Sequence, residues 1–210
     1  MQQSNESTKQ SLVSLKDITK SFGKQSVLCG LSLEFNHTGL YIIKGPSGSG
    51  KTTLLRIIAG LDNDFTGEVT GAGISNCSYA FQEHRLFPAA SAFDNVFAVT
   101  RGSDSERTKC AMDALISVGF DPEDFEKLPS ELSGGMKQRV SLARAIAADK
   151  PILLLDEPTK ELDQALRSKL QKLFIELSKK KLIIAVTHLE DDITALSDKI
   201  IDLSQVQSAN

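Results

Sequence analysis

The segment GPSGSGKT, residues 45–52, combines glycines with a lysine and a threonine at the spacing G-x-x-x-x-G-K-[ST]. It follows the apolar run GLYIIK and precedes the helical pattern KTTLLRIIAGL, the strand–loop–helix context in which this spacing binds phosphate. Backbone N–H groups of such a loop curl around phosphate oxygens, and the helix N-terminus adds about half a positive charge. Lys51 suits the β- and γ-phosphates, and the Thr52 hydroxyl suits Mg²⁺. We therefore expect a nucleoside triphosphate site formed by Gly45, Pro46, Ser47, Gly48, Ser49, Gly50, Lys51, Thr52 and Thr53.

Two adjacent carboxylates follow the apolar run ILLL, at Asp156 and Glu157. Neighbouring residues at a strand end point in different directions, so the two groups can do different work. Asp156 suits Mg²⁺, directly or through water, and Glu157 suits polarising an attacking water. Ligands of α/β sheets bind at the carboxyl ends of the strands, where these residues are expected.

His188 ends the next apolar run, IIAVTH, and is expected along the same sheet edge. That placement favours a contact with the γ-phosphate, although a structural histidine is the alternative.

A second stretch, LSGGMKQRV at residues 132–140, also has the chemistry of an anion site at a helix N-terminus. Ser133, Gly134 and Gly135 open its helical run. One chain binds one triphosphate, and the first loop already covers the β- and γ-oxygens, so this second site has no phosphate to hold within its own chain.

The elements that position these residues alternate between strands and helices. Apolar strand patterns at residues 39–44, 151–156 and 181–188 are each followed by helical patterns, which predicts an α/β fold with a parallel core. Two β-rich stretches at residues 11–35 precede them. About 50 residues from Gln82 to Ser133 are mostly helical in pattern and interrupt the alternation, so we expect them to form a subdomain.

Composition sets limits on the class of protein. The chain has 210 residues, 40% of them hydrophobic, and a net charge of −3, which gives no indication of nucleic-acid binding. Its three cysteines show no metal-binding spacing and favour a reducing compartment. Residues 1–10 are polar and are expected to be a disordered tail. The apolar runs are strand-length, far short of the ~20 residues that span a bilayer, so any membrane role requires a partner.

The order of the motifs resembles the nucleotide-binding subunit of ABC transporters from about residue 14 to residue 203. GPSGSGKT is followed by FQE, LSGGM, ILLLDEPT, LD and VTH. The resemblance implies a P-loop NTPase core with a mostly parallel sheet, an N-terminal antiparallel β subdomain and an inserted α-helical subdomain. It implies one domain over residues 11–205, with the core and β subdomain at 11–82 and 134–205 and the helical subdomain at about 83–133.

The resemblance also implies roles for single residues. Phe22 is similar to the aromatic residue that stacks on adenine, with an ordinary strand aromatic as the alternative. Gln82 is similar to the Q-loop residue that contacts Mg²⁺ or water and relays the nucleotide state to a membrane partner. Asp163 is similar to the D-loop aspartate at a dimer seam. The signature loop, residues 133–135, would close on the γ-phosphate bound by a second cassette, arranged head to tail.

The implied function is therefore ATP hydrolysis with Mg²⁺, in a dimer of this chain or of this chain with a homologous cassette, at the cytoplasmic face of the cell membrane. The helical block and residues 83–97 would form the groove for a separate membrane permease. FQEHRLFPAASAFDNV resembles the nitrate/sulfonate/taurine importer group, in which an extracytoplasmic substrate-binding protein feeds the permease. Three alternatives stay open: a lipoprotein-release or cell-division mechanotransmission complex, a non-hydrolysing ATP-gated clamp, and a small-molecule kinase.

Four residues depart from the common pattern of that family. Met136 replaces the usual Gln, Lys160 and Glu161 stand where Ser-Ala is common, and Leu189 follows His188 where Asp is common. None of them removes a phosphate, metal or base group, so we expect an active ATPase. Lys160 and Glu161 could alter the dimer seam.

Overall fold

The computed structural model describes residues 12–187 and 199–204. Its strands are β1(Val13–Phe22), β2(Gln25–Phe35), β3(Gly39–Lys44), β4(Thr66–Thr70), β5(Cys77–Ala80), β6(Ile152–Asp156), β7(Leu182–Val186) and β8(Lys199–Asp202). Its helices are α1(Lys51–Ile58), α2(Ala92–Phe97), α3(Asp104–Ser117), α4(Gly134–Ala147) and α5(Gln164–Ser178), with short 3-10 helices η1(Pro122–Asp124) and η2(Pro129–Glu131).

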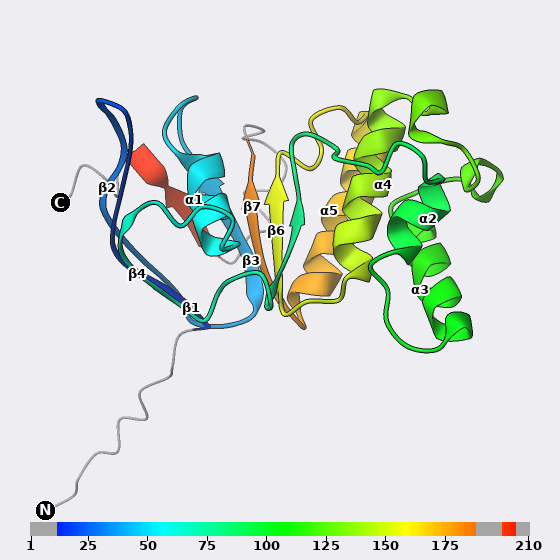
Figure 1. Ribbon diagram of the computed structural model, residues 1–210, viewed down its shortest axis with the longest axis horizontal. Helices are drawn as coiled ribbons and strands as arrows, with labels where there is room; N and C mark the ends of the chain where they lie inside the picture. The colour runs from blue at the N-terminus through cyan, green and yellow to red at the C-terminus, as the bar shows by residue number, and fades with distance from the viewer. Residues whose placement is uncertain (1–11, 188–198, 205–210) are drawn as a thin grey trace, which may run out of the picture.

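The centre of the molecule is a parallel sheet with strand order β5-β6-β7-β3-β8. Every residue of β6 and β7 is buried, which is the burial expected of strands covered on both faces. In Figure 1, α1 and the N-terminal strands lie on one side of this sheet, and α4 and α5 lie on the other. The sheet therefore separates two hydrophobic cores.

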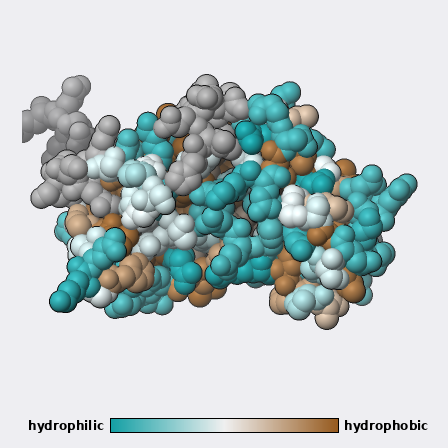
Figure 2. Space-filling model, turned by 90° about the horizontal axis from the view of Figure 1, so that it is seen from above, coloured by the Kyte–Doolittle hydropathy of each residue, from teal (hydrophilic) through white to brown (hydrophobic). Residues whose placement is uncertain are grey.

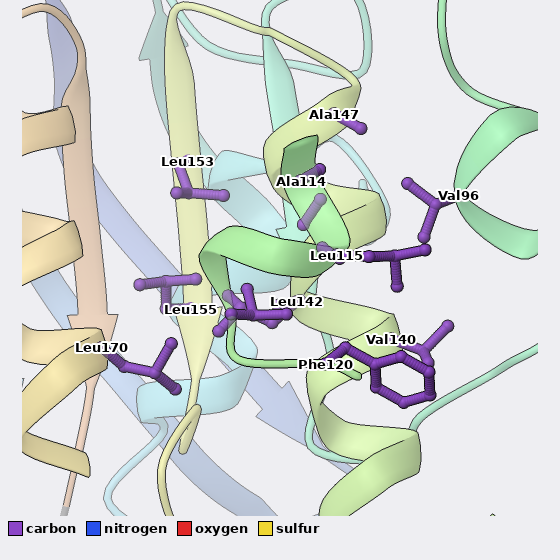
Figure 3. Packing of buried hydrophobic residues seen from close by; sticks show 14 of the residues in the cluster. Val96, Ala114, Leu115, Phe120, Val140, Leu142, Ala147, Leu153, Leu155 and Leu170 are labelled. Carbon is purple, nitrogen blue, oxygen red and sulfur yellow. The ribbon is translucent and has the colours of Figure 1, made fainter. Parts of the chain in front are cut away.

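Alternate residues of each central strand contribute to these two cores. Leu153 and Leu155 of β6 pack with α3, α4 and α5, whereas Ile152 and Leu154 pack with α1, β1 and β2. This is the period-2 alternation of side chains along a strand. Figure 3 shows the first core, in which Leu142 of α4 lies beside Leu153 and Leu155.

A second sheet is antiparallel, with strand order β2-β1-β4. Its buried residues alternate with exposed ones, so that one face, including Leu15 and Leu31, packs into the core shared with α1. The register of β1 against β2 shifts at several points, as β-bulges or other irregular pairing produce. Phe22, the last residue of β1, lines the same cavity as residues of the loop before α1.

The segment between β5 and α4 contains α2, α3, η1 and η2, as its mostly helical pattern predicts. Ser103 and Glu106 form a capping box that starts α3. Leu115 and Phe120 then pack against Val140 of α4 in the first core (Figure 3). The segment lies at the end of the molecule remote from the antiparallel sheet (Figure 1).

The expected fold class is confirmed: a mostly parallel α/β core, an N-terminal antiparallel sheet and an inserted helical segment. The proposed domain boundaries stay predictions. The expected tail at residues 1–10 lies outside the described residues, as does the expected helix after His188. Within the described part of the chain, no helix is long and apolar enough to cross a membrane.

One buried amide organises the loop that precedes α2. Asn95 is fully buried, and its Oδ1 accepts a hydrogen bond from the Phe87 N–H at 2.7 Å. Its Nδ2 donates to the carbonyls of Ala90 at 3.0 Å, Ser91 at 2.9 Å and Phe87 at 3.2 Å. The conformation of residues 87–91 therefore depends on this side chain.

Replacing Asn95 with leucine should lower the free energy of unfolding by about 3 kcal/mol, because buried backbone groups lose their partners. Chemical denaturation followed by circular dichroism measures this. Asn63→Leu, at an exposed position, is the control and should change stability by about 0.5 kcal/mol or less. Equal effects of the two changes would contradict the role assigned to Asn95.

Candidate functional site

The phosphate-binding loop connects β3 to α1 and depends on glycine at two positions. Gly48 and Gly50 have φ angles of 80° and 91°, in the left-handed region that favours glycine. A Cβ on Gly50 would also lie 2.8 Å from side-chain atoms of Val27 and Leu28. The loop therefore packs closely under β2, and its chain direction presents the N-terminus of α1 to a ligand.

Lys51, the first residue of α1, is buried and folded back over the loop. Its Nζ donates hydrogen bonds to the carbonyls of Gly45 and Pro46, both at 2.8 Å. Burial lowers the pKa of the ammonium, and the nearby carboxylates of Glu157 and Asp156 oppose that shift. The lysine charge is thus held in place at the loop before any phosphate arrives.

Asp156 ends β6 and is almost fully buried, with both carboxylate oxygens occupied. Oδ1 accepts from the Thr52 hydroxyl at 3.3 Å, and Oδ2 accepts from the Tyr79 hydroxyl at 3.1 Å. Burial raises the pKa of the carboxyl, while the bonds from Thr52 and Tyr79 lower it. These contacts fix the orientation of the carboxylate at the carboxyl edge of the sheet.

The oxygens of Thr52 and Asp156 fit a magnesium ion. A hydroxyl and a carboxylate 3.3 Å apart, beside a phosphate-binding loop, are hard oxygen donors of the kind that Mg²⁺ prefers. Among the described residues, no group of three or more His, Cys, Asp or Glu side chains is placed to hold a metal.

Glu157 follows Asp156 directly, at the start of the turn after β6. Its φ of 50° lies in the left-handed region, which is rare for a residue with a side chain and often marks functional sites. Its N–H donates to the Val186 carbonyl at 2.9 Å. Its carboxylate is only 11% exposed and lies 2.7 Å from the Lys160 ammonium.

A cavity of about 470 Å³ unites most of these groups. This volume is typical of small-ligand sites. The lining residues are Phe22, Gln25, Val27, Ser47, Gly48, Gly50, Lys51, Thr52, Thr53, Gln82, Glu157, Lys160 and Val186. Figure 2 looks onto the end of the molecule at which β6 ends, where the described surface is largely hydrophilic.

Of the three residues suggested by family resemblance alone, Phe22 and Gln82 line this cavity, whereas Asp163 is not among its lining residues. Phe22 is 54% exposed, which leaves its ring available for stacking. Gln25, Val27 and Val186 were not predicted to line the site, and Lys160 was singled out only as a departure at the dimer seam. Tyr79 was not predicted either, because a tyrosine one residue before the end of a strand is only a weak signal.

The signature loop lies elsewhere in the chain. Ser133 caps α4, and its hydroxyl accepts from the Met136 N–H at 3.3 Å. Ser133, Gly134 and Gly135 are not among the described residues that line the 470 Å³ cavity. The two helix starts that the sequence predicts to bind anions therefore do not share this cavity.

The turn between β6 and α5 holds the remaining residues. The Asp163 side chain caps α5 by accepting from the Leu166 N–H at 2.9 Å. Glu161 Oε2 lies 3.7 Å from His84 Nε2. The same oxygen lies close to Gly134, where an added Cβ would be only 2.5 Å from Glu161 Oε2. His188 and Leu189 lie outside the described residues, so the structure leaves their predicted roles untested.

A parallel sheet whose strand ends carry this loop and this buried carboxylate defines a P-loop nucleotide-binding protein. The chain belongs to the ABC transporter family, whose model matches residues 28–160. It is accordingly an ATP-binding cassette with ATP hydrolase activity.

Two curated relatives share most of this chain. It is 40% identical over 205 residues to the aliphatic sulfonates import ATP-binding protein SsuB of Bacillus cereus (strain ZK / E33L), covering 91% of this chain and 81% of the relative. It is 36% identical over 210 residues to the sulfate/thiosulfate import ATP-binding protein CysA of Escherichia coli (strain K12), covering 92% of this chain and 58% of the relative.

Two similar solved structures are both dimers of the bacterial ABC transporter cassette MJ0796. One is a post-hydrolysis state bound to ADP and Pi, with a TM-score of 0.81, and the other has a TM-score of 0.83. Each is 32% identical to this chain and covers 90% of it and 93% of the solved chain.

Replacing Tyr79 with phenylalanine tests how Asp156 is held. The ring should stay stacked on Phe81, 4.1 Å away, while a hydrogen bond to a buried carboxylate is lost. We expect the nucleotide-free protein to lose about 1–2 kcal/mol of stability, measured by chemical denaturation.

Tyr41→Phe, at the only other tyrosine, is the matched control. Its hydroxyl lies 3.3–3.4 Å from the ring nitrogens of His37, so its removal should cost less. A loss of stability confined to Tyr41→Phe would contradict the role of the Tyr79 hydroxyl as a hydrogen-bond donor that stabilises Asp156.

Proposed function

We propose that this chain is the ATP-hydrolysing subunit of a bacterial ABC importer and energises a separate membrane permease. The observation that carries the proposal is the single cavity shared by Lys51, Thr52 and Glu157. It joins a phosphate site to a carboxylate suited to polarising water. Binding alone would require only the first of these.

ATP binds with its phosphates on residues 45–53 and its adenine on Phe22. Backbone N–H groups of the loop and the start of α1 hold the β- and γ-oxygens, and Lys51 moves from its carbonyl partners to the phosphates. The exposed Phe22 ring, which also lines the cavity, offers a stacking face.

Thr52, Asp156 and Gln82 would hold Mg²⁺. When bound, the ion neutralises negative charge on the β- and γ-phosphates. The Tyr79 hydroxyl keeps the Asp156 carboxylate in a fixed orientation, which is the usual contribution of a residue behind a metal ligand.

Glu157 orients the attacking water and accepts its proton. The side chain is mostly shielded yet faces the cavity, as a general base requires. His188, by its position after β7 in the sequence, would contact the γ-phosphate. Positioning and electrostatics supply nearly all of the catalysis in such phosphoryl transfers.

The complete site requires a second cassette. Ser133, Gly134 and Gly135 of one subunit would bind the γ-phosphate held by the other, with Asp163 at the seam. Two observations support this. The signature loop stands apart from the cavity in its own chain, and the similar solved cassettes are dimers.

Glu157→Gln should reduce ATP turnover about 100-fold or more, because the amide cannot accept the proton. ATP binding should persist, and ATP should then trap the dimer. Phosphate release and sedimentation of the purified protein measure both effects. Wild-type protein without turnover, alone and with its permease, would instead favour the ATP-gated clamp.

Ser133→Ala and Gly135→Asp should leave ATP binding to the monomer nearly unchanged and abolish ATP-driven dimerisation and turnover. The helix cap lost with Ser133 costs about 1 kcal/mol, so Ser103→Ala, which removes the corresponding cap of α3, is the matched control. Fluorescent ATP-analogue binding and sedimentation separate the two effects. Loss of monomer binding would overturn the two-chain site.

The permease would dock on residues 83–97, at the cytoplasmic face of the membrane. Phe87 is 55% exposed there, on the loop fixed by Asn95, and its ring lies 5.8 Å from the Arg144 guanidinium. Similarity to importer subunits for sulfonates and sulfate supports an importer of the nitrate/sulfonate/taurine type, fed by a substrate-binding protein. Reconstituted uptake of these anions tests that assignment.

A further inference from the structure

We infer that Lys160 is a positioning residue for Glu157: its ammonium holds the carboxylate at the wall of the nucleotide cavity. The inference rests on the proposed role of Glu157 and extends it to a residue at which this chain departs from the pattern common in its family.

The contact is short and is built into the turn that follows β6. Lys160 Nζ lies 2.7 Å from Glu157 Oε2. The Lys160 N–H also donates to the Glu157 carbonyl at 3.3 Å, which closes a turn with the glutamate at its first position. Side chain and backbone therefore both connect these two residues.

The burial of the two partners is unequal. The carboxylate is 11% exposed, whereas the lysine side chain is 59% exposed and reaches over it from outside. Lys160 also lines a second cavity of about 320 Å³, together with Gln82 and Glu161. The ammonium thus lies where the nucleotide cavity meets the neighbouring one.

The negative charges around Glu157 explain why a cation at position 160 would keep its carboxylate in the cavity. Glu157 stands next to the Asp156 carboxylate and must stay beside a triphosphate once ATP binds. Like charges repel, and repulsion would turn the glutamate out of the cavity. Lys51 is near, but its Nζ donates to the carbonyls of Gly45 and Pro46. Lys160 supplies a second positive charge, in direct contact with the Glu157 carboxylate.

The ion pair acts together with the backbone of Glu157. Oε2 is the carboxylate oxygen that contacts the ammonium, and the φ of 50° at Glu157 places the start of its side chain in a left-handed turn. Lys160 thus acts through Glu157 and does not need to touch the reacting atoms.

The test is a charge series at position 160, with kcat, KM and ATP-analogue affinity measured for each variant. Lys160→Gln should lower kcat about two- to fivefold, the range expected from an exposed ion pair, and leave analogue affinity near the wild-type value. Lys160→Glu should lower kcat further, because it adds a carboxylate. Lys160→Arg should restore most of the wild-type kcat.

The matched control is Lys179→Glu. Lys179 and Glu176 form a 2.6 Å pair at the same i,i+3 spacing on α5, with both side chains exposed and outside the lining of the nucleotide cavity. Its kcat should equal that of the wild type. A wild-type or raised kcat in Lys160→Gln, an arginine variant as slow as the glutamine variant, or an equal loss in the control would overturn the inference.

A second measurement does not depend on turnover. In the nucleotide-free protein, Lys160→Gln and Glu157→Gln should shift the melting temperature non-additively, with a coupling of about 1–3 °C. Additive shifts would overturn the pairing. A coupled pair in a protein that hydrolyses no ATP would overturn the proposed function while leaving the contact intact.

Discussion

The hydrogen bond between Thr52 and Asp156 is the contact on which the whole site depends. It joins residues 104 positions apart, one on the first turn of α1 and the other at the end of β6. It forms because α1 packs over β6 and β7, and because β3, which feeds the phosphate-binding loop, pairs in register with β7. Any slip of these buried strands would separate the loop from the carboxylate.

Because Asp156 is buried, its carboxylate must be stabilised by hydrogen bonds from within the protein. Asp156 is removed from water, which raises the pKa of its carboxyl, and Thr52 and Tyr79 compensate with one hydrogen bond to each oxygen. Burial and the adjacent carboxylate likewise raise the pKa of Tyr79, so the phenol stays a donor. Two neutral hydroxyl groups thus stabilise the buried Asp156 carboxylate, whereas the cationic side chains of Lys51 and Lys160 line the cavity.

Much of this could be predicted from the sequence, because the phosphate-binding loop, the apolar strands and the terminal carboxylates are all local patterns. Tyr79 and Lys160 could not. The Tyr79 hydroxyl reaches Asp156 only because β5 pairs with β6, with Tyr79 opposite Leu154. From its place in the sequence, Lys160 is expected to be an exposed lysine in a loop. Its contact with Glu157 depends on the left-handed backbone at Glu157, which folds the turn back on itself. Such contacts depend on tertiary register, which no short window of sequence encodes.

The two departures at positions 160 and 161 make different contacts, although both residues line the 320 Å³ cavity. Lys160 contacts the carboxylate of the nucleotide cavity, whereas the Glu161 carboxylate lies against Gly134 at the start of α4. A helix N-terminus attracts anions, so Glu161 already supplies negative charge where the proposed dimer would place a phosphate from the other subunit. In the proposed dimer, this side chain would have to move before a phosphate could reach the start of α4.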